Sequence, residues 1–192
     1  RFRAAAHLWR DSVGTLWVGT LADRPLSIFG RDARRFVTYG EESGFPKRGP
    51  TAFAEDRAGN VWIGVYGKGV VRATGKKPPH FEWITKGIPT GLVRDLKIDS
   101  EGGLWVGSTD GVARIKDPTR PASQLEIEYF SEDTGLASNS GYCFVEMPGR
   151  RMGIGSQRGF DILDRTTGRV THLTMRDGLA NNEVAVAMLD GT

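Results

Sequence analysis

A short motif that recurs at fixed internal spacing constrains this chain more than any other feature. An aspartate is followed by glycine three residues later, tryptophan six residues later and a second glycine eight residues later; the pattern begins at Asp11, Asp56 and Asp99. A degenerate fourth copy spans residues 147–156, where Met147 replaces the acid and Gly153 the tryptophan. Such self-similarity predicts a repeat architecture in which one supersecondary unit is stacked several times.

A second marker, a glycine followed by an apolar residue, precedes each later anchor motif. The final glycine of the anchor follows this marker by 20 residues, in 44–64, 87–107 and 135–155. The distance from that glycine to the next marker varies from 23 to 28 residues, so the full period is 43–48 residues. This period is typical of a propeller blade. Variation confined to one segment predicts fixed strands joined by loops of variable length.

Each repeat contains the pattern of four short β-strands. Residues 93–98 and 183–189 alternate in hydrophobicity with a period of two, which is typical of a half-buried strand. Residues 104–106 are β-prone and bounded by glycines, and 69–72 and 111–115 form a third type of strand. The fourth strands are expected at 36–39, 81–84, 127–130 and 170–173. Four antiparallel strands per period indicate a blade of a β-propeller.

The predicted fold is therefore an all-β propeller that occupies residues 1–192. We expect four four-stranded antiparallel blades and part of a fifth that begins at about residue 183, with blade anchors at 11–20, 56–65, 99–108 and 147–156. The surplus strand repeats the first strand of the first blade instead of completing that blade. Because exposed strand edges are avoided in proteins, we expect an arc of a larger ring of about seven blades. The arc either continues into further blades or pairs its open ends with another copy.

The repeated residues are expected to be structural. Trp17, Trp62 and Trp105 occupy one position of an apolar strand, so they should pack between neighbouring blades. The repeated aspartates begin turns, where a carboxylate accepts backbone N–H bonds.

Composition excludes several classes of function. The chain has 26 Lys and Arg residues against 23 Asp and Glu residues, and the basic residues form no continuous run. This balance argues against nucleic-acid binding. Cys143 is the single cysteine, so no intrachain disulfide forms, and no apolar stretch is long enough to span a membrane. The three histidines share no ligand spacing, and no nucleophile or phosphate motif occurs. We expect no catalytic residue, metal or cofactor. Because position 1 is Arg1 rather than methionine, we expect the chain to be part of a longer protein.

Two sets of loops differ from blade to blade and are the candidate ligand site. One set follows the second strand of each blade and the other enters the first strand; in a propeller both emerge on the same face, around the central channel. Varied polar, charged and aromatic groups on a rigid ring suit recognition of a small polar ligand. The predicted ligand-binding residues are Tyr66, Lys68, Arg94, Asp110, Asn139, Arg158 and Asn181.

The repeat resembles the two-component regulator propeller repeat. The matching segments are Asp11 to Thr20, Asn60 to Arg72, Leu104 to Arg114, and 178–181, and together they extend over essentially the whole chain. Two departures stand out: residues 21–26 replace the expected Gly-Gly-Leu of the first repeat, and Arg150 occupies a glycine position of the fourth.

The resemblance implies the periplasmic sensor region of a bacterial membrane receptor that carries a histidine kinase or diguanylate cyclase outside this sequence. It implies an oligosaccharide or similar polar ligand, a homodimer through the full-length receptor, and membrane attachment only through other segments. The family has no fixed catalytic residues, so the resemblance implies none in this sequence. Two alternatives stay open: a propeller-based lyase or hydrolase, and a protein–protein interaction scaffold.

Overall fold

The chain folds into four four-stranded antiparallel sheets, and the prediction of four propeller blades is confirmed. The computed structural model describes residues 5–20, 25–65, 67–75 and 78–188. In each sheet the strands lie in chain order. The blades consist of β1 (Ala5–Arg10), β2 (Leu16–Thr20), β3 (Leu26–Phe29) and β4 (Val37–Tyr39); β5 (Pro50–Glu55), β6 (Val61–Val65), β7 (Gly69–Thr74) and β8 (His80–Ile84); β9 (Val93–Ile98), β10 (Leu104–Ser108), β11 (Val112–Ile115) and β12 (Ile127–Phe130); and β13 (Cys143–Met147), β14 (Arg151–Ser156), β15 (Gly159–Asp164) and β16 (Val170–Leu173).

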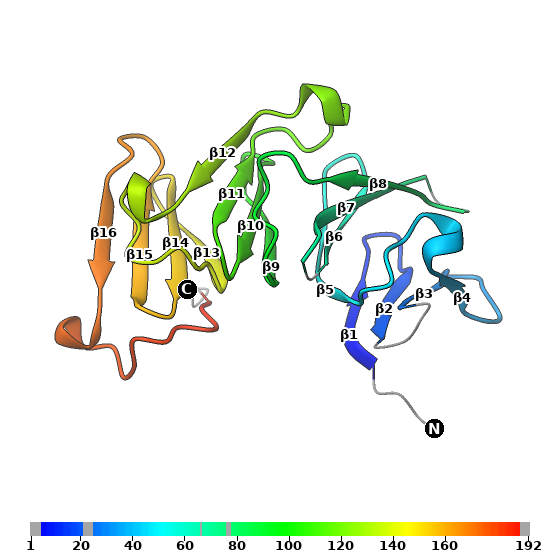
Figure 1. Cartoon of the computed structure of the whole chain (residues 1–192), viewed down its shortest axis with the longest axis horizontal. Helices are drawn as coiled ribbons and strands as arrows, with labels where there is room; N and C mark the ends of the chain where they lie inside the picture. The colour runs from blue at the N-terminus through cyan, green and yellow to red at the C-terminus, as the bar shows by residue number, and fades with distance from the viewer. Residues whose placement is uncertain (1–4, 21–24, 66, 76–77, 189–192) are drawn as a thin grey trace.

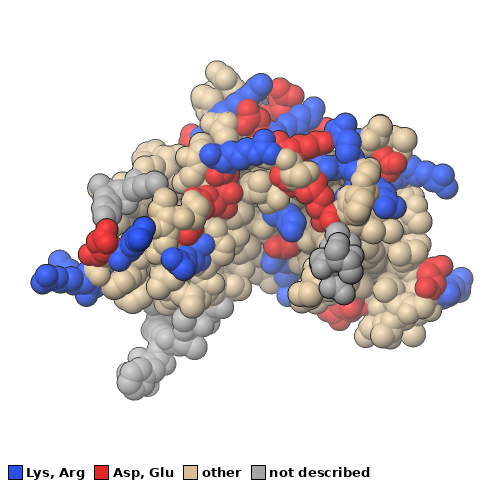
Figure 2. All heavy atoms as spheres, turned by 180° about the vertical axis from the view of Figure 1, so that it is seen from behind, with Lys and Arg blue, Asp and Glu red and all other residues tan. Residues whose placement is uncertain are grey.

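The four blades follow one another along an open arc, with the first and the last blade at opposite ends (Figure 1). The first strands form the inner side of the arc, where β5 contacts both β1 and β9, and β9 contacts β13. Short 3₁₀ turns at η1 (Glu41–Ser43), η2 (Ala122–Gln124), η3 (Glu132–Thr134) and η4 (Met175–Asp177) lie in the connections. Cationic and acidic side chains stand side by side along the upper rim of the arc (Figure 2), which is typical of a mixed, well-solvated surface.

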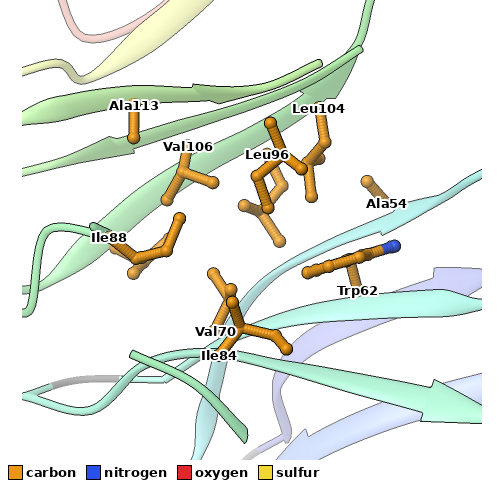
Figure 3. Close-up of a cluster of buried hydrophobic side chains, with 11 residues drawn as sticks. Ala54, Trp62, Val70, Ile84, Ile88, Leu96, Leu104, Val106 and Ala113 are labelled. Carbon is orange, nitrogen blue, oxygen red and sulfur yellow. The ribbon is translucent and has the colours of Figure 1, made fainter. Parts of the chain in front are cut away.

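Among the described residues, three hydrophobic cores lie between neighbouring blades. Each contains one anchor tryptophan: Trp17 is 5% exposed, and Trp62 and Trp105 are fully buried. In the core between the second and third blades, Trp62 and Val70 face Leu96 and other side chains of the third blade (Figure 3). The prediction that the tryptophans occupy equivalent buried sites between blades is therefore confirmed.

Each anchor aspartate uses both carboxylate oxygens. Oδ1 accepts the backbone N–H four residues later, at 2.7 Å for Asp11, 3.0 Å for Asp56 and 2.8 Å for Asp99, as the sequence predicts. Oδ2 accepts the indole N–H of the tryptophan six residues later, at 3.1, 2.9 and 2.9 Å, a bond that the sequence analysis did not anticipate. The spacing of six residues thus reflects one carboxylate that closes the turn and orients the ring.

The last glycine of each anchor lies where the next blade passes closest. A Cβ atom on Gly64 would lie 2.5 Å from Cγ1 of Val93, and one on Gly107 would lie 2.7 Å from the carbonyl oxygen of Gly141. Such distances are shorter than van der Waals contact, so only glycine allows the first strand of the next blade to approach.

The fourth blade lacks the tryptophan, and Phe160 takes its space. A Cβ atom on Gly153 would collide with the Phe160 ring and with Val145. Arg150, in the place of the first anchor glycine, has a positive φ of 59° and pairs with Glu101 of the third blade at 2.7 Å. The lost motif is therefore replaced by a different ring and by an ion pair between the third and fourth blades. We call the boundary between two neighbouring blades a seam.

Residues 183–188 follow the path of a first strand without being one. The Val184 N–H donates to the Ser156 carbonyl at 2.8 Å, as the Gly141 N–H does to Ser108 in the preceding blade. The structure assigns no strand to residues 183–188, where the sequence predicts the start of a fifth blade, because the described residues contain no second strand for this segment to pair with. Asp190, which stands at the position of an anchor aspartate in the predicted fifth blade, lies outside the described residues.

Arginines from two blades meet at Asp99. Arg114 Nε lies 2.9 Å and Arg165 Nη1 2.8 Å from Asp99 Oδ2, and the Arg165 side chain is only 6% exposed. Burial by itself would raise the pKa of Asp99, but hydrogen bonds from Arg114, Trp105 and the Gly103 N–H outweigh this effect and hold the pKa below its usual value.

We predict that Trp62→Ala lowers the free energy of unfolding by about 3–5 kcal/mol, because it empties a fully buried site between two blades. Trp62→Phe should cost about 1–3 kcal/mol, since the buried Asp56 carboxylate loses a donor. Urea denaturation measures both. Trp83→Phe is the matched control, because its indole donates to the exposed Gly44 carbonyl, and it should cost much less. Equal costs for the two Phe variants would contradict the role of the aspartate–tryptophan bond.

We predict that Asp99 contributes to acid sensitivity. Its folded-state pKa is depressed, so the ionised form stabilises the fold above the unfolded-state pKa of about 3.9, and this stabilisation is lost as the pH falls through the folded-state pKa. Asp99→Asn should be less stable than the wild type at neutral pH, and its unfolding free energy should fall less between about pH 5 and pH 2. The exposed Asp133→Asn is the control. If the unfolding free energies of the wild type and Asp99→Asn fell by the same amount as the pH was lowered, this role would be refuted.

Candidate ligand-binding face

The variable loops gather at one end of the blades, as the sequence predicts. In an antiparallel meander, the turn after the second strand and the link into the next first strand lie at the same end. Hydrogen bonds join the two sets: the Gly67 N–H donates to the Gly91 carbonyl at 3.2 Å, and the Thr109 N–H to the Leu92 carbonyl at 3.2 Å. We call this end the loop face, and the opposite end, with the aspartate turns, the anchor end.

Lys68 lies at a hollow between the first and second blades. The hollow has a volume of about 480 Å³ and is lined by Glu41, Gly44, Phe45, Pro46, Lys47, Arg48, Lys68 and Trp83. The ammonium of Lys68 lies 6.0 Å from the ring centroid of Trp83, which is 37% exposed. The indole N–H donates to the Gly44 carbonyl at 3.1 Å, so the ring is held in place. Tyr66, also predicted here, lies outside the described residues.

Arg94 lies on the inner strand β9, against an aromatic ring of the next blade. Its guanidinium carbon is 4.8 Å from the centroid of the Tyr142 ring. Next to it, Asp95 Oδ2 accepts the Phe144 N–H at 2.9 Å and thereby ties β9 to β13. Burial raises the pKa of the Asp95 carboxyl, although the backbone N–H bonds to it act in the opposite direction. The inner strands therefore carry a cation stacked on a tyrosine.

Asn139 and Arg158 are brought together by Glu132. Asn139 Oδ1 accepts the Glu132 N–H at 2.8 Å, and Arg158 Nη1 lies 3.0 Å from Glu132 Oε1 and 3.3 Å from the Ala137 carbonyl. All three residues are exposed. The structure thus places two of the predicted residues in one charged cluster on the fourth blade.

Asp110 and Asn181 mainly hold their own loops. Asp110 Oδ1 accepts the Gly91 N–H at 2.9 Å and also the hydroxyl of Ser108. Asn181 Oδ1 accepts the Glu183 N–H at 3.0 Å. Both are exposed and remain accessible from the loop face.

Asn139 also has a structural equivalent. Asn182, one repeat later, accepts the Met175 N–H at 2.9 Å with the same separation of seven residues. Both bonds fasten the 3₁₀ turn, η3 or η4, to the link that follows it. The repetition indicates that Asn139 is a loop-fastening residue.

The sequence analysis did not single out three side chains on the fourth, outermost strands of the blades. Trp83, Tyr129 and His172 occupy equivalent places opposite Val71, Ala113 and Asp161 of the third strands. The Tyr129 hydroxyl donates to the Asp110 carbonyl at 2.8 Å, and His172 Nδ1 lies 2.6 Å from Asp161 Oδ1. The sequence signal that could have identified these residues is an aromatic side chain at the same exposed position of three predicted edge strands.

The groups that the loop face presents are aromatic, cationic and hydrogen-bonding. Among the described residues, no group of three or more His, Cys, Asp or Glu side chains is placed to hold a metal ion. In the same part of the chain, no helix is long and apolar enough to cross a membrane. The loop face offers an exposed indole, a tyrosine and several cations on rigid blades, which can provide stacking and hydrogen bonding.

Comparison with known families and sequences identifies one repeat. Residues 87–110 match the family described as two component regulator propeller. This segment covers the marker of the third blade, β9, the Asp99 turn and β10. Comparison with curated protein sequences gives no match.

Solved structures share the fold at low sequence identity. The chain is similar to the extracellular domain of the putative hybrid two component system BT3049 from B. thetaiotaomicron, with a TM-score of 0.75, 15% identity, and coverage of 92% of this chain and 24% of that one. It is similar to PorZ of Porphyromonas gingivalis, with a TM-score of 0.73, 11% identity, and coverage of 98% and 29%. Virginiamycin B lyase from Staphylococcus aureus follows with a TM-score of 0.64, 14% identity, and coverage of 86% and 53%. The chain thus spans between a quarter and about half of these structures.

We predict that Asn139→Ala lowers the free energy of unfolding by about 0.5–1.5 kcal/mol, because the Glu132 N–H loses its acceptor. Asn182→Ala should cost a similar amount, since it removes the equivalent bond. Chemical denaturation checks both values. Gln157→Ala, an exposed change on the same face, is the control and should be close to neutral. An unchanged stability of both Asn variants would leave Asn139 as a free surface residue.

Proposed function

We propose that this chain, which carries a two component regulator propeller repeat, is the ligand-sensing propeller of a bacterial signal-transduction receptor and lies outside the cytoplasm. The fold shared with an extracellular sensor domain supports this proposal. The chain spans 24% of that domain, so it corresponds to an arc of blades within a larger sensing region.

The ligand is a small polar molecule, an oligosaccharide or a compound of similar chemistry, bound at the loop face. The observation that carries this proposal is the hollow of about 480 Å³ beside Lys68 and Trp83. A fixed, partly exposed indole offers an apolar platform for the C–H face of a sugar ring, while Lys68, Lys47 and Glu41 offer hydrogen bonds to hydroxyl groups. The volume falls in the usual range of small-molecule sites, roughly 300–1,000 Å³.

Signalling would follow from a change in packing rather than from chemistry within these blades. A ligand shifts an equilibrium between two receptor arrangements only if it binds one of them more tightly. A ligand that contacts two neighbouring blades on the loop face could favour one packing of two receptor chains. A homodimer of the full-length receptor is therefore part of the proposal, with a histidine kinase or diguanylate cyclase as the output.

A lyase is the second candidate function. It is favoured by the fold shared with virginiamycin B lyase and by the pair of His172 and Asp161, where a buried carboxylate lies 2.6 Å from Nδ1 of a half-exposed imidazole. Such a pair can act as a general base. Incubation with quinupristin, followed by mass spectrometry, separates the candidates: a sensor leaves the compound intact, and a lyase opens it in a way that His172→Ala abolishes.

We predict that the protein binds at least one glycan of an oligosaccharide array through the Lys68–Trp83 hollow. Trp83→Ala and Lys68→Ala should each weaken binding by about tenfold or more, as expected for an aromatic anchor and its cationic partner. Titration calorimetry with the best glycan measures the affinities. Lys116→Ala at the anchor end is the matched control and should bind like the wild type. Binding that is unaffected by the Trp83 and Lys68 changes would refute this site, and an array without signal would refute the saccharide class.

A further inference from the structure

The three seams between blades can be compared at the anchor end, because the third and fourth strands pair in the same register. In the second blade, Arg72 of the third strand lies opposite Glu82 of the fourth. In the third blade, Arg114 lies opposite Glu128 in the same way. Each arginine also covers the anchor tryptophan of its own blade. The guanidinium carbon of Arg72 lies 5.4 Å from the ring centroid of Trp62, and that of Arg114 lies 5.8 Å from the ring centroid of Trp105. The repeat thus uses an arginine–glutamate pair to close the seam beside the tryptophan.

Both of these seams receive a further polar group from the next blade. Arg72 donates to the carbonyls of Pro118 and Arg120 in the loop between β11 and β12. In the seam between the third and fourth blades, Arg165 reaches Asp99 and Glu146 at 2.8 and 2.7 Å. Charged groups therefore line the space that the outer strands leave open, and the hollow of about 360 Å³ that remains in the seam between the third and fourth blades is bordered by Glu101, Arg114 and Arg165.

The seam between the first and second blades breaks this rule. Ile28 and Val37 occupy the positions of the arginine and the glutamate, in the same register. They line a hollow of about 640 Å³ together with Val13, Tyr39 and Pro78. Val13 and Val37 are 41% and 50% exposed, although the equivalent positions of the third blade carry Glu101 and Glu128. An apolar hollow thus replaces an ion-pair network.

A turn with a net positive charge borders this hollow. Arg31 and Asp32 of this turn, which joins β3 to β4, line the hollow. The turn also carries Arg34 and Arg35, so its sequence contains three cations and one acid. Exposed apolar side chains that surround a concave site indicate a binding function. The volume is that of a small-molecule site, roughly 300–1,000 Å³.

We propose that the seam between the first and second blades binds a small anionic amphiphile: a molecule with one apolar chain or ring system and a single anionic head. The apolar body lies against Ile28, Val37 and Tyr39, and the head pairs with Arg31 and its neighbours. The site lies at the anchor end, opposite the loop face, so the proposal goes beyond the sensing of a polar ligand and stands independently of it.

Decanoate and the fluorescent sulfonate 8-anilinonaphthalene-1-sulfonate are the probes. We expect saturable binding of the sulfonate and its displacement by decanoate, but not by decyltrimethylammonium, whose head carries the opposite charge. Methyl NMR of the wild-type protein locates the site: decanoate should shift the methyl signals of Val13, Ile28 and Val37, while those of Ile154 stay in place. Shifts at the exposed Val186 and Met188 instead would overturn the proposal, since they would indicate non-specific binding at the far end of the arc.

The double variant Ile28→Arg/Val37→Glu is the decisive change, because it restores the pair that the second and third blades already contain. It should weaken decanoate binding by about tenfold or more. Thr171→Arg, which adds a cation to the exposed edge strand β16, is the control and should bind like the wild type. Wild-type affinity in the double variant would overturn the proposal. If the double variant unfolds, Arg31→Ala with Arg34→Ala tests the head group, and an unchanged affinity for decanoate in that variant would also overturn it.

Discussion

One hydrogen-bonding group, the carboxylate of the anchor aspartate, supports the rest of the structure. Its first oxygen closes the turn between the first and second strands, and its second oxygen holds the indole of the tryptophan. The turn is local, but the ring packs in the core between two blades. The same carboxylate therefore couples the conformation of one hairpin to the packing of its neighbour. A buried carboxylate is costly without partners, and here each oxygen has at least one donor.

This repeated frame leaves the ends of the blades free to differ. The first strand of each following blade approaches most closely at the anchor glycines, where the lack of a side chain makes room for it. Beyond that point, each seam has its own chemistry: carbonyl groups and an arginine in one, an arginine pair in another, and apolar side chains in the first. A rigid frame with variable seams and loops allows separate sites at the two ends of the blades. We propose the loop face and the first seam as two such sites.

The loops of the candidate site were predictable, but their partners were not. Spacing alone placed Lys68, Arg94 and Arg158 in loops or strand ends on one face, because the connectivity of an antiparallel blade determines which connections share an end. The residues that they meet, Trp83, Tyr142 and Glu132, come from other strands or links and are distant in sequence. Asn139 was predicted as a ligand residue from its place in a variable loop. The structure adds that it fastens that loop, as the equivalent Asn182 does one repeat later.

The sequence by itself determined the strand pattern, the number of blades described and the burial of the three tryptophans. These depend on a local period and on residues that act identically in each copy, so repetition reveals them. Only the tertiary structure decided that Phe160 fills the space above Gly153, that Arg165 crosses to Asp99, and that Ile28 and Val37 leave a hollow. Each of these depends on which side chains two blades direct at one another across a seam. That contact joins residues tens of positions apart and differs at every seam, so no periodic pattern encodes it.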